Sequence, residues 1–124
     1  GMGSDSGKAT AGYDRGQLRV QYDESQEPVF ADIRRGLGLL ERESGERVHV
    51  LNRPFTVHQW GGASLGPDAL TGVVDHRGEV YGNPGLYITD GAALPAAVGS
   101  PPSVSIAAWA HYVADGIVGA KSAV

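Results

Sequence analysis

Glycine restricts the fold of this chain more than any other residue, because it recurs too often for long helices or strands. The sequence holds 19 glycines in 124 residues, about twice the usual share of ~7%. In the run GGASLGPDALTG, residues 61–72, Gly and Pro interrupt every window that could hold regular structure. We therefore expect a loop there, with tight turns or a backbone that comes close to a ligand.

Regular structure is predicted before this run. The stretch QLRVQYD, residues 17–23, alternates apolar and polar side chains and indicates a half-buried strand. Apolar residues then recur at spacings of three and four over residues 29–43. This spacing predicts a helix that begins after Pro28 and stops at Gly45.

The rest of the chain mixes short strands with one further helix. VHVLN (48–52) and FTVH (55–58) favour two short strands or one interrupted strand. VVDHRGEVYG (73–82) fits a hairpin, and LYITDG (86–91) fits a buried strand. Helical spacing returns from residue 103 to 119. The predicted class is α+β, with a small mixed or antiparallel sheet and two main helices.

Length and composition limit the organisation to one core. Residues 1–12 are small and polar, and Gly1 ahead of Met2 is typical of tag cleavage. We expect residues 1–12 to be disordered or tag-derived, with two segments, 13–57 and 58–124, forming the fold.

Charge and composition exclude several function classes. The net charge of -4 and a pI near 5.4 leave no basic field for nucleic acid or anionic lipid. The absence of cysteine excludes disulfides and thiolate chemistry. No apolar run approaches the ~20 residues of a membrane span, so we expect a cytoplasmic protein.

Two chemistries compete for HQWGGASLG, residues 58–66. The part GASLG matches the Gly-x-Ser-x-Gly elbow of serine hydrolases around Ser64, and Asp90 and His111 follow in the order of a triad. An elbow requires a strand, a turn and then a helix, and the Gly and Pro residues after Ser64 leave no room for that helix. A serine hydrolase is therefore the minor alternative.

A metal site is not expected. The candidate ligands come from three segments without the i, i+4 spacing of helical metal ligands; they are His49, His58, Asp75 and His76.

The other chemistry centres on His58 and rests on a resemblance. Residues 58–118 contain His-x-x-Gly-Gly, then Asp-x-x-Gly-x-Val-x-Gly, then an apolar stretch ending Asp90-Gly91, then a helix ending ADGIV. This order resembles the carboxy-terminal segment of the glucose-methanol-choline (GMC) flavoprotein oxidoreductases, nearest to their cholesterol oxidase branch. Several linked motifs in order are more specific than any one motif. The resemblance implies the end of a substrate-binding domain in residues 13–57 and the last strand and helix of an FAD domain in residues 58–124.

The resemblance also implies a role for each matching residue. His58 corresponds to the histidine that removes the proton of the substrate hydroxyl while hydride passes to the flavin, and the ordinary pKa of histidine suits this task near neutrality. The implied cofactor is FAD, and the residues expected to line it are Gly61, Gly62, Asp90, Gly91, Ser103 and Val104.

Two departures from the family pattern shape the expected function. Pro101 stands where the family has a second catalytic Asn or His, and the chain has no Gly-x-Gly-x-x-Gly motif for the FAD pyrophosphate. We therefore expect a fragment or subunit of an FAD-dependent alcohol oxidoreductase, with a sterol or another hydrophobic alcohol as its substrate. It would be inactive until a partner chain supplies the amino-terminal FAD domain. The alternative is an inert fragment or binding module that self-associates as a homodimer or swapped oligomer.

Overall fold

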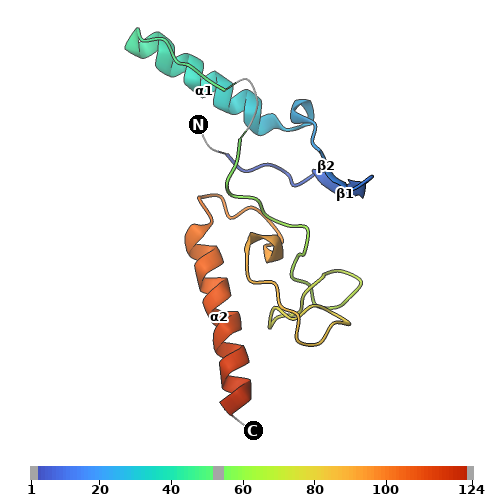
Figure 1. Cartoon of the computed structure of the whole chain (residues 1–124). Helices are drawn as coiled ribbons and strands as arrows, with labels where there is room; N and C mark the ends of the chain where they lie inside the picture. The colour runs from blue at the N-terminus through green and yellow to red at the C-terminus, as the bar shows by residue number, and fades with distance from the viewer. Residues whose placement is uncertain (1–2, 52–54, 123–124) are drawn as a thin grey trace. The chain divides into compact units, whose positions relative to one another are not determined.

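The computed structural model describes residues 3–51 and 55–122. The chain forms two compact units, Gly1–Val57 and His58–Val124, which we call unit 1 and unit 2. The described part contains two helices and one two-stranded antiparallel sheet (Figure 1). The predicted α+β class is confirmed.

Unit 1 begins with a β-hairpin. Strand β1 (Thr10–Asp14) pairs with β2 (Gln17–Gln21), and the turn residues Arg15 and Gly16 have φ of 49° and 80°. Positive φ at both positions is typical of a type I′ turn, whose twist matches that of the strands. The strand predicted from residue 17 is present, but β1 starts within residues 1–12, which composition had excluded from the fold. Every residue of both strands is exposed, so the expected half-burial is wrong.

Helix α1 (Pro28–Ser44) matches the prediction closely. Pro28 occupies the first position, where its missing N–H costs no helical hydrogen bond. The helix ends at Gly45, whose φ of 72° is left-handed and whose N–H donates to the carbonyl of Glu41 at 3.0 Å. Glycine accepts this conformation without strain, so the helix stops where the sequence indicated.

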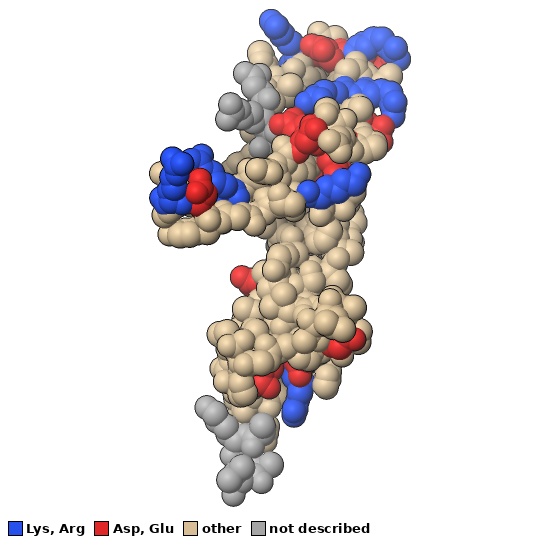
Figure 2. Space-filling model, turned by 90° about the vertical axis from the view of Figure 1, so that its right-hand side faces the viewer, with Lys and Arg blue, Asp and Glu red and all other residues tan. Residues whose placement is uncertain are grey.

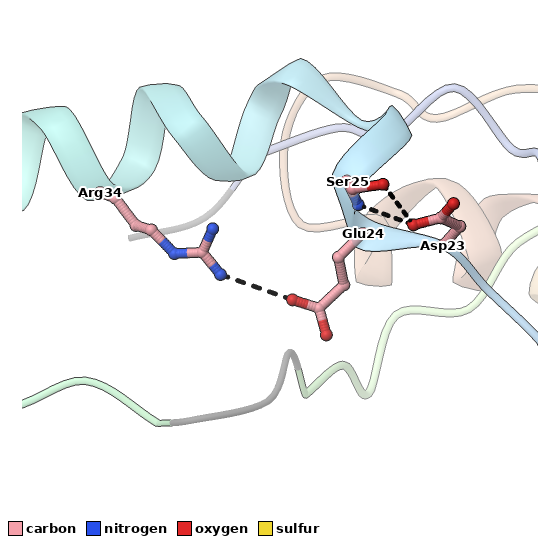
Figure 3. Close-up of polar contacts among 4 residues, drawn as sticks. All are labelled: Asp23, Glu24, Ser25 and Arg34. Carbon is pink, nitrogen blue, oxygen red and sulfur yellow. Dashed lines mark hydrogen bonds and ion pairs between the residues drawn. The ribbon is translucent and has the colours of Figure 1, made fainter.

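A short 3-10 helix, η1 (Glu24–Gln26), leads into α1. The Asp23 carboxylate accepts hydrogen bonds from the backbone N–H and the hydroxyl of Ser25, at 3.0 and 2.6 Å (Figure 3). Arg34 of α1 reaches back to the carboxylate of Glu24 at 3.5 Å. The ion pair connects η1 to α1, with Arg34 66% exposed and Glu24 33% exposed.

The start of the chain is attached to α1 through Glu27. This side chain is only 4% exposed, and it is the one buried residue among those described in unit 1. Its carboxylate accepts from the backbone N–H of Ser6 at 2.9 Å and from the Ser6 hydroxyl at 2.5 Å. Unit 1 therefore has a polar anchor where a hydrophobic core would be expected.

Unit 2 is built mainly from turns and isolated bridges. Val74 pairs with Leu65 in parallel and with Val80 antiparallel. The buried apolar side chains of the described residues all lie in this unit; they are Val74, Ala93, Pro102 and Val113. A small core therefore forms without a continuous sheet.

The strands predicted on either side of the glycine-rich run are absent. Residues 48–51 and 55–58 form no strand, and residues 52–54 lie outside the described residues. In LYITDG only Tyr87 pairs, through a single bridge to Glu79, and Leu86 is half exposed. The hairpin at 73–82 keeps its turn, with the N–H of Gly78 donating to the carbonyl of Asp75 at 2.9 Å, but its pairing stops after one bridge. Short stretches of high strand propensity need a neighbouring strand to pair with, and these stretches have none of sufficient length.

Helix α2 (Ser103–Ser122) runs past Gly119, the predicted end. Val113 is 1% exposed, and a Cβ at Gly78 would come within 2.7 Å of its side chain, so the 75–78 turn lies directly against the helix. The Trp109 Nε1–H donates to the carbonyl of Ile88 at 3.0 Å. In the described part of the chain, no helix is both long enough and apolar enough to cross a membrane.

Candidate functional site

Three hydrogen bonds join the glycine loop after His58 to η2 (Gly91–Ala93), a 3-10 turn. The N–H groups of Gly61, Ala63 and Leu65 donate to the carbonyls of Gly91, Ala92 and Ala93, at 3.2, 3.1 and 2.9 Å. Two segments about thirty residues apart in sequence are thus connected along their backbones. We call this set of three bonds the ladder.

The glycine pair has a conformation that other residues rarely adopt. Gly61 and Gly62 have φ of 77° and 95°, in the region where a Cβ causes strain. A Cβ at Gly62 would meet no atom within 4 Å, and Gly62 is exposed. Backbone conformation alone therefore requires glycine here, and it leaves the outer face of the loop open. His58 precedes the pair and is half-buried.

Asp90 and Gly91 fill two different structural roles. The Asp90 carboxylate caps η2 by accepting the N–H of Ala92 at 2.9 Å. Gly91 is buried, and a Cβ on it would lie 2.5 Å from the carbonyl oxygen of Gln59 and 3.2 Å from the Ile106 side chain. Gly91 is thus the point where the His58 loop, η2 and the first turn of α2 meet.

Ser103 and Val104 form the start of α2 and are both exposed. The carbonyl of Pro102 accepts the N–H of Ile106 at 2.8 Å, which begins the helical pattern. The amides of a first helical turn have no acceptor within the helix. The structure therefore brings the segments of all the sequence-predicted site residues into one unit, and Ile106, to which the sequence assigned no site role, lies beside Gly91.

Ser64 does not have the setting of a hydrolase nucleophile. Its carbonyl accepts the N–H groups of Val73 and Val74 at 2.8 and 3.4 Å, and a loop follows it where an elbow needs a helix. His111, which would complete the triad, pairs with Asp115 one helical turn away, at 3.0 Å. The Gly-x-Ser-x-Gly pattern is therefore present in the sequence without the helix that a nucleophile elbow needs after the serine.

The loop after Ser64 is closed by two glycines that sequence did not pair. A Cβ at Gly66 or Gly72 would lie 2.4 to 2.6 Å from the backbone of the other. The Tyr81 hydroxyl donates to the carbonyl of Gly66 at 3.0 Å, and its burial together with the nearby Asp75 and Asp68 carboxylates raises the pKa of Tyr81. Among the described residues, no three His, Asp or Glu side chains gather in a way that could hold a metal ion.

Comparison with known proteins identifies relatives that match about half of the chain. It is 49% identical over 66 residues to a cholesterol oxidase of Mycobacterium tuberculosis, an alignment that covers 53% of this chain and 11% of that protein. It is 38% identical over 64 residues to a long-chain-alcohol oxidase of Arabidopsis thaliana, covering 52% of this chain and 9% of that protein. A cholesterol oxidase of Acinetobacter baumannii is 39% identical over 62 residues, covering 50% of this chain and 11% of that protein.

The chain therefore spans about a tenth of the length of these relatives. No solved structure matches it significantly. The carboxy-terminal family model of the GMC oxidoreductases matches residues 40–110, more than half of the sequence. The chain belongs to the GMC oxidoreductase family.

Proposed function

We propose that this chain is the carboxy-terminal part of an FAD-dependent alcohol oxidoreductase in which His58 is the active-site base. The observation that carries the proposal is the ladder, because it holds the loop after His58 against η2 by backbone bonds. A base must be held in a defined position to act on a substrate proton, and a loop bonded along its backbone meets that need. Membership of the GMC family supports the same role.

The proposed substrate is a bulky hydrophobic alcohol. Two of the relatives are cholesterol oxidases and a third is a long-chain-alcohol oxidase. Both names describe a hydroxyl on a large apolar body. We therefore place a sterol or long-chain alcohol ahead of small polar alcohols such as sugars.

The described residues fit part of an FAD site. The outer face of Gly62 is open, so a flat ring could approach the backbone there without meeting a Cβ. The start of α2, at Ser103 and Val104, presents the positive end of a 20-residue helix, which favours a negatively charged group. We propose that these residues lie along FAD, together with Gly61 and the Asp90-Gly91 turn. Bound FAD would supply the hydride acceptor.

His58 supplies the proton acceptor in this scheme. An imidazole nitrogen would accept the proton of the substrate hydroxyl as hydride leaves the carbon that bears this hydroxyl. The ladder keeps the loop in place, and the glycines keep its outer face free for the reactants. We expect the 124-residue chain alone to be colourless and inactive, because a pyrophosphate cradle of the Gly-x-Gly-x-x-Gly kind is absent from its sequence.

The test combines this chain with an amino-terminal part that carries the Gly-x-Gly-x-x-Gly motif. In the reconstituted complex, His58→Ala should lower turnover of a sterol or long-chain alcohol by roughly a hundredfold or more, the loss typical of a general base. Bound FAD, read from its visible absorption, should not change. His111→Ala is the matched control, because that histidine is 79% exposed on α2 and should leave turnover intact. Full activity in His58→Ala would refute the proposed role.

A further inference from the structure

Gly91 is the tightest point between the His58 loop and the rest of unit 2. A Cβ on Gly91 would lie 2.5 Å from the carbonyl oxygen of Gln59, the residue that follows His58. No such separation occurs between a real Cβ and an oxygen, so one side would have to move. The carbonyl of Gly91 also accepts the N–H of Gly61 at 3.2 Å. The backbone of Gly91 is therefore bonded to the loop, and the absence of a side chain lets the Gln59 carbonyl come close to it.

Position 91 needs glycine for lack of space and not for its backbone conformation. Gly91 is not among the glycines with positive φ, which include Gly61 and Gly62. An alanine could therefore adopt the backbone conformation of Gly91, and its methyl group would be the sole source of conflict. Alanine substitution thus tests one contact without adding backbone strain.

The two neighbours of that methyl group differ in how easily they can yield. Ile106 would be 3.2 Å away through its terminal Cδ1, and a flexible side-chain end can rotate aside. The Gln59 oxygen belongs to the main chain, so relieving the 2.5 Å contact requires backbone to shift, either at the Gln59–Trp60 peptide or at η2. Because the ladder bonds η2 to the loop, either shift is transmitted to the loop that carries His58.

From these contacts we infer that Gly91 is a positioning residue for His58: its lack of a side chain sets how closely the Gln59 peptide approaches η2. This inference rests on the proposed role of His58 for its catalytic meaning. This role adds to the proposed place of the Asp90-Gly91 turn along FAD, because it acts through the buried contact of Gly91 with the Gln59 carbonyl.

The first experiment uses the 124-residue chain alone, labelled with ¹⁵N and ¹³C. In Gly91→Ala, the amide signals of residues 59–63 and the His58 ring signals should move, and the Gly61 amide should exchange with solvent at least ~10-fold faster than in the unchanged chain. Signals of Val113 and Asp115, on α2 and away from the contact, should stay in place. The control is Gly116→Ala, since a Cβ there meets nothing within 4 Å; it should leave the His58 signals unchanged.

A double variant separates the two neighbours. Ile106→Ala opens space on the α2 side only, so Gly91→Ala with Ile106→Ala should keep the displaced His58 signals. Their return to the original positions would overturn the inference, because the helix and not the Gln59 carbonyl would then be the constraint. Unmoved His58 signals in a folded Gly91→Ala variant would overturn it as well.

If Gly91→Ala does not fold, amide exchange in the unchanged chain tests the inference instead. Slow exchange of the Gly61 amide would show that the Gly61–Gly91 bond holds the loop, whereas exchange as fast as that of exposed Gly62 would overturn the inference. In the reconstituted enzyme, Gly91→Ala should lower kcat by up to ~100-fold, the cost of a misplaced base, with little change in KM. If His58→Ala is fully active while the signals still move, the proposed function fails and the structural role of Gly91 remains.

Discussion

Glu27 shows how a single polar residue can organise a unit that lacks an apolar core. Its carboxylate is buried without a salt-bridge partner among the described residues, and Ser6 supplies both hydrogen bonds. Hydrogen bonds to the charged form hold the pKa of Glu27 below its ordinary value, with the Ser6 hydroxyl as the largest cause and the Ser6 amide next. The contact therefore favours the folded state only while Glu27 is ionised.

Acid should weaken this anchor in a defined direction. Because the folded-state pKa is below the ordinary value of 4.5, the stabilisation is fully present above that pH and is lost as pH falls through the lower folded value. We expect the melting temperature of unit 1, followed by signals of α1, to decrease as pH is lowered from about 4.5 to about 2. Ser6→Ala should flatten this decrease relative to the unchanged chain. An identical pH profile in Ser6→Ala would rule out the Ser6 hydroxyl bond as the cause.

At the scale of elements, the sequence predicted correctly those features that depend on neighbouring residues, such as the two ends of α1. Pro28 and Gly45 gave the bounds of α1 to within one residue, since each acts through its own backbone. Among the described residues, the strands predicted at 48–52, 55–58 and 86–91 are absent, because strand formation depends on a distant partner that no local pattern reveals. The β1 strand was not predicted, although its partner is close in sequence. Residues 1–12 are small and polar, which hid the fact that β1 pairs with β2 across a two-residue turn.

Helix α1 should be easy to strengthen. Gly36 and Gly38 lie in its interior, and a Cβ at either position would meet nothing within 4 Å. Gly36→Ala and Gly38→Ala should each stabilise the helix by roughly 0.5–1 kcal/mol, seen as greater helical circular dichroism and a higher melting temperature. Gly45→Ala is the contrasting variant, because its φ of 72° disfavours a Cβ, and it should lower stability. A loss of helicity in the first two variants would mean that this helix face packs closely against something.

At the scale of the whole molecule, unit 2 has a surface unlike that of an independent soluble domain. Arg77 and Lys121 are the only Arg or Lys residues in the sequence from 58 to 124, and large areas of the face in Figure 2 carry no charged side chain. Helix α2 is apolar on several sides: Val113 points inward, while Val104, Tyr112 and Val118 are 82%, 56% and 63% exposed. Such a helix is typical of the interior of a larger protein.

This surface predicts self-association of the chain when it is alone. Exposed apolar patches recruit other chains, and the simplest outcome is a two-fold dimer that buries the outer face of α2. Light scattering at micromolar concentration should give a mass above that of the 12.9 kDa monomer. Val104→Glu with Val118→Glu should shift the population toward monomer. A monomer in the unchanged chain at these concentrations would contradict the prediction.

The candidate site was predictable in its segments but not in its connections. The motif order in the sequence marked His58, the glycine pair, Asp90-Gly91 and the start of α2, and the structure brings these segments into unit 2. The ladder and the contact at Gly91 involve backbone atoms that every residue has, so no residue type in the sequence indicates them. In the sequence, Ile106 is only one of the residues in the helical spacing of 103–119.

The pairing of Gly66 with Gly72 has a consequence for how this protein can be engineered. The two backbones meet so closely that the residues between them leave and re-enter the unit at one point, and Leu70 among them is 96% exposed. Extending a loop whose ends are already fixed costs little, since the entropy of closure grows only slowly with length. Residues 67–71 are therefore a suitable place to insert a fluorophore tag or an affinity peptide, with Gly66 and Gly72 left as the permanent boundary of the insert.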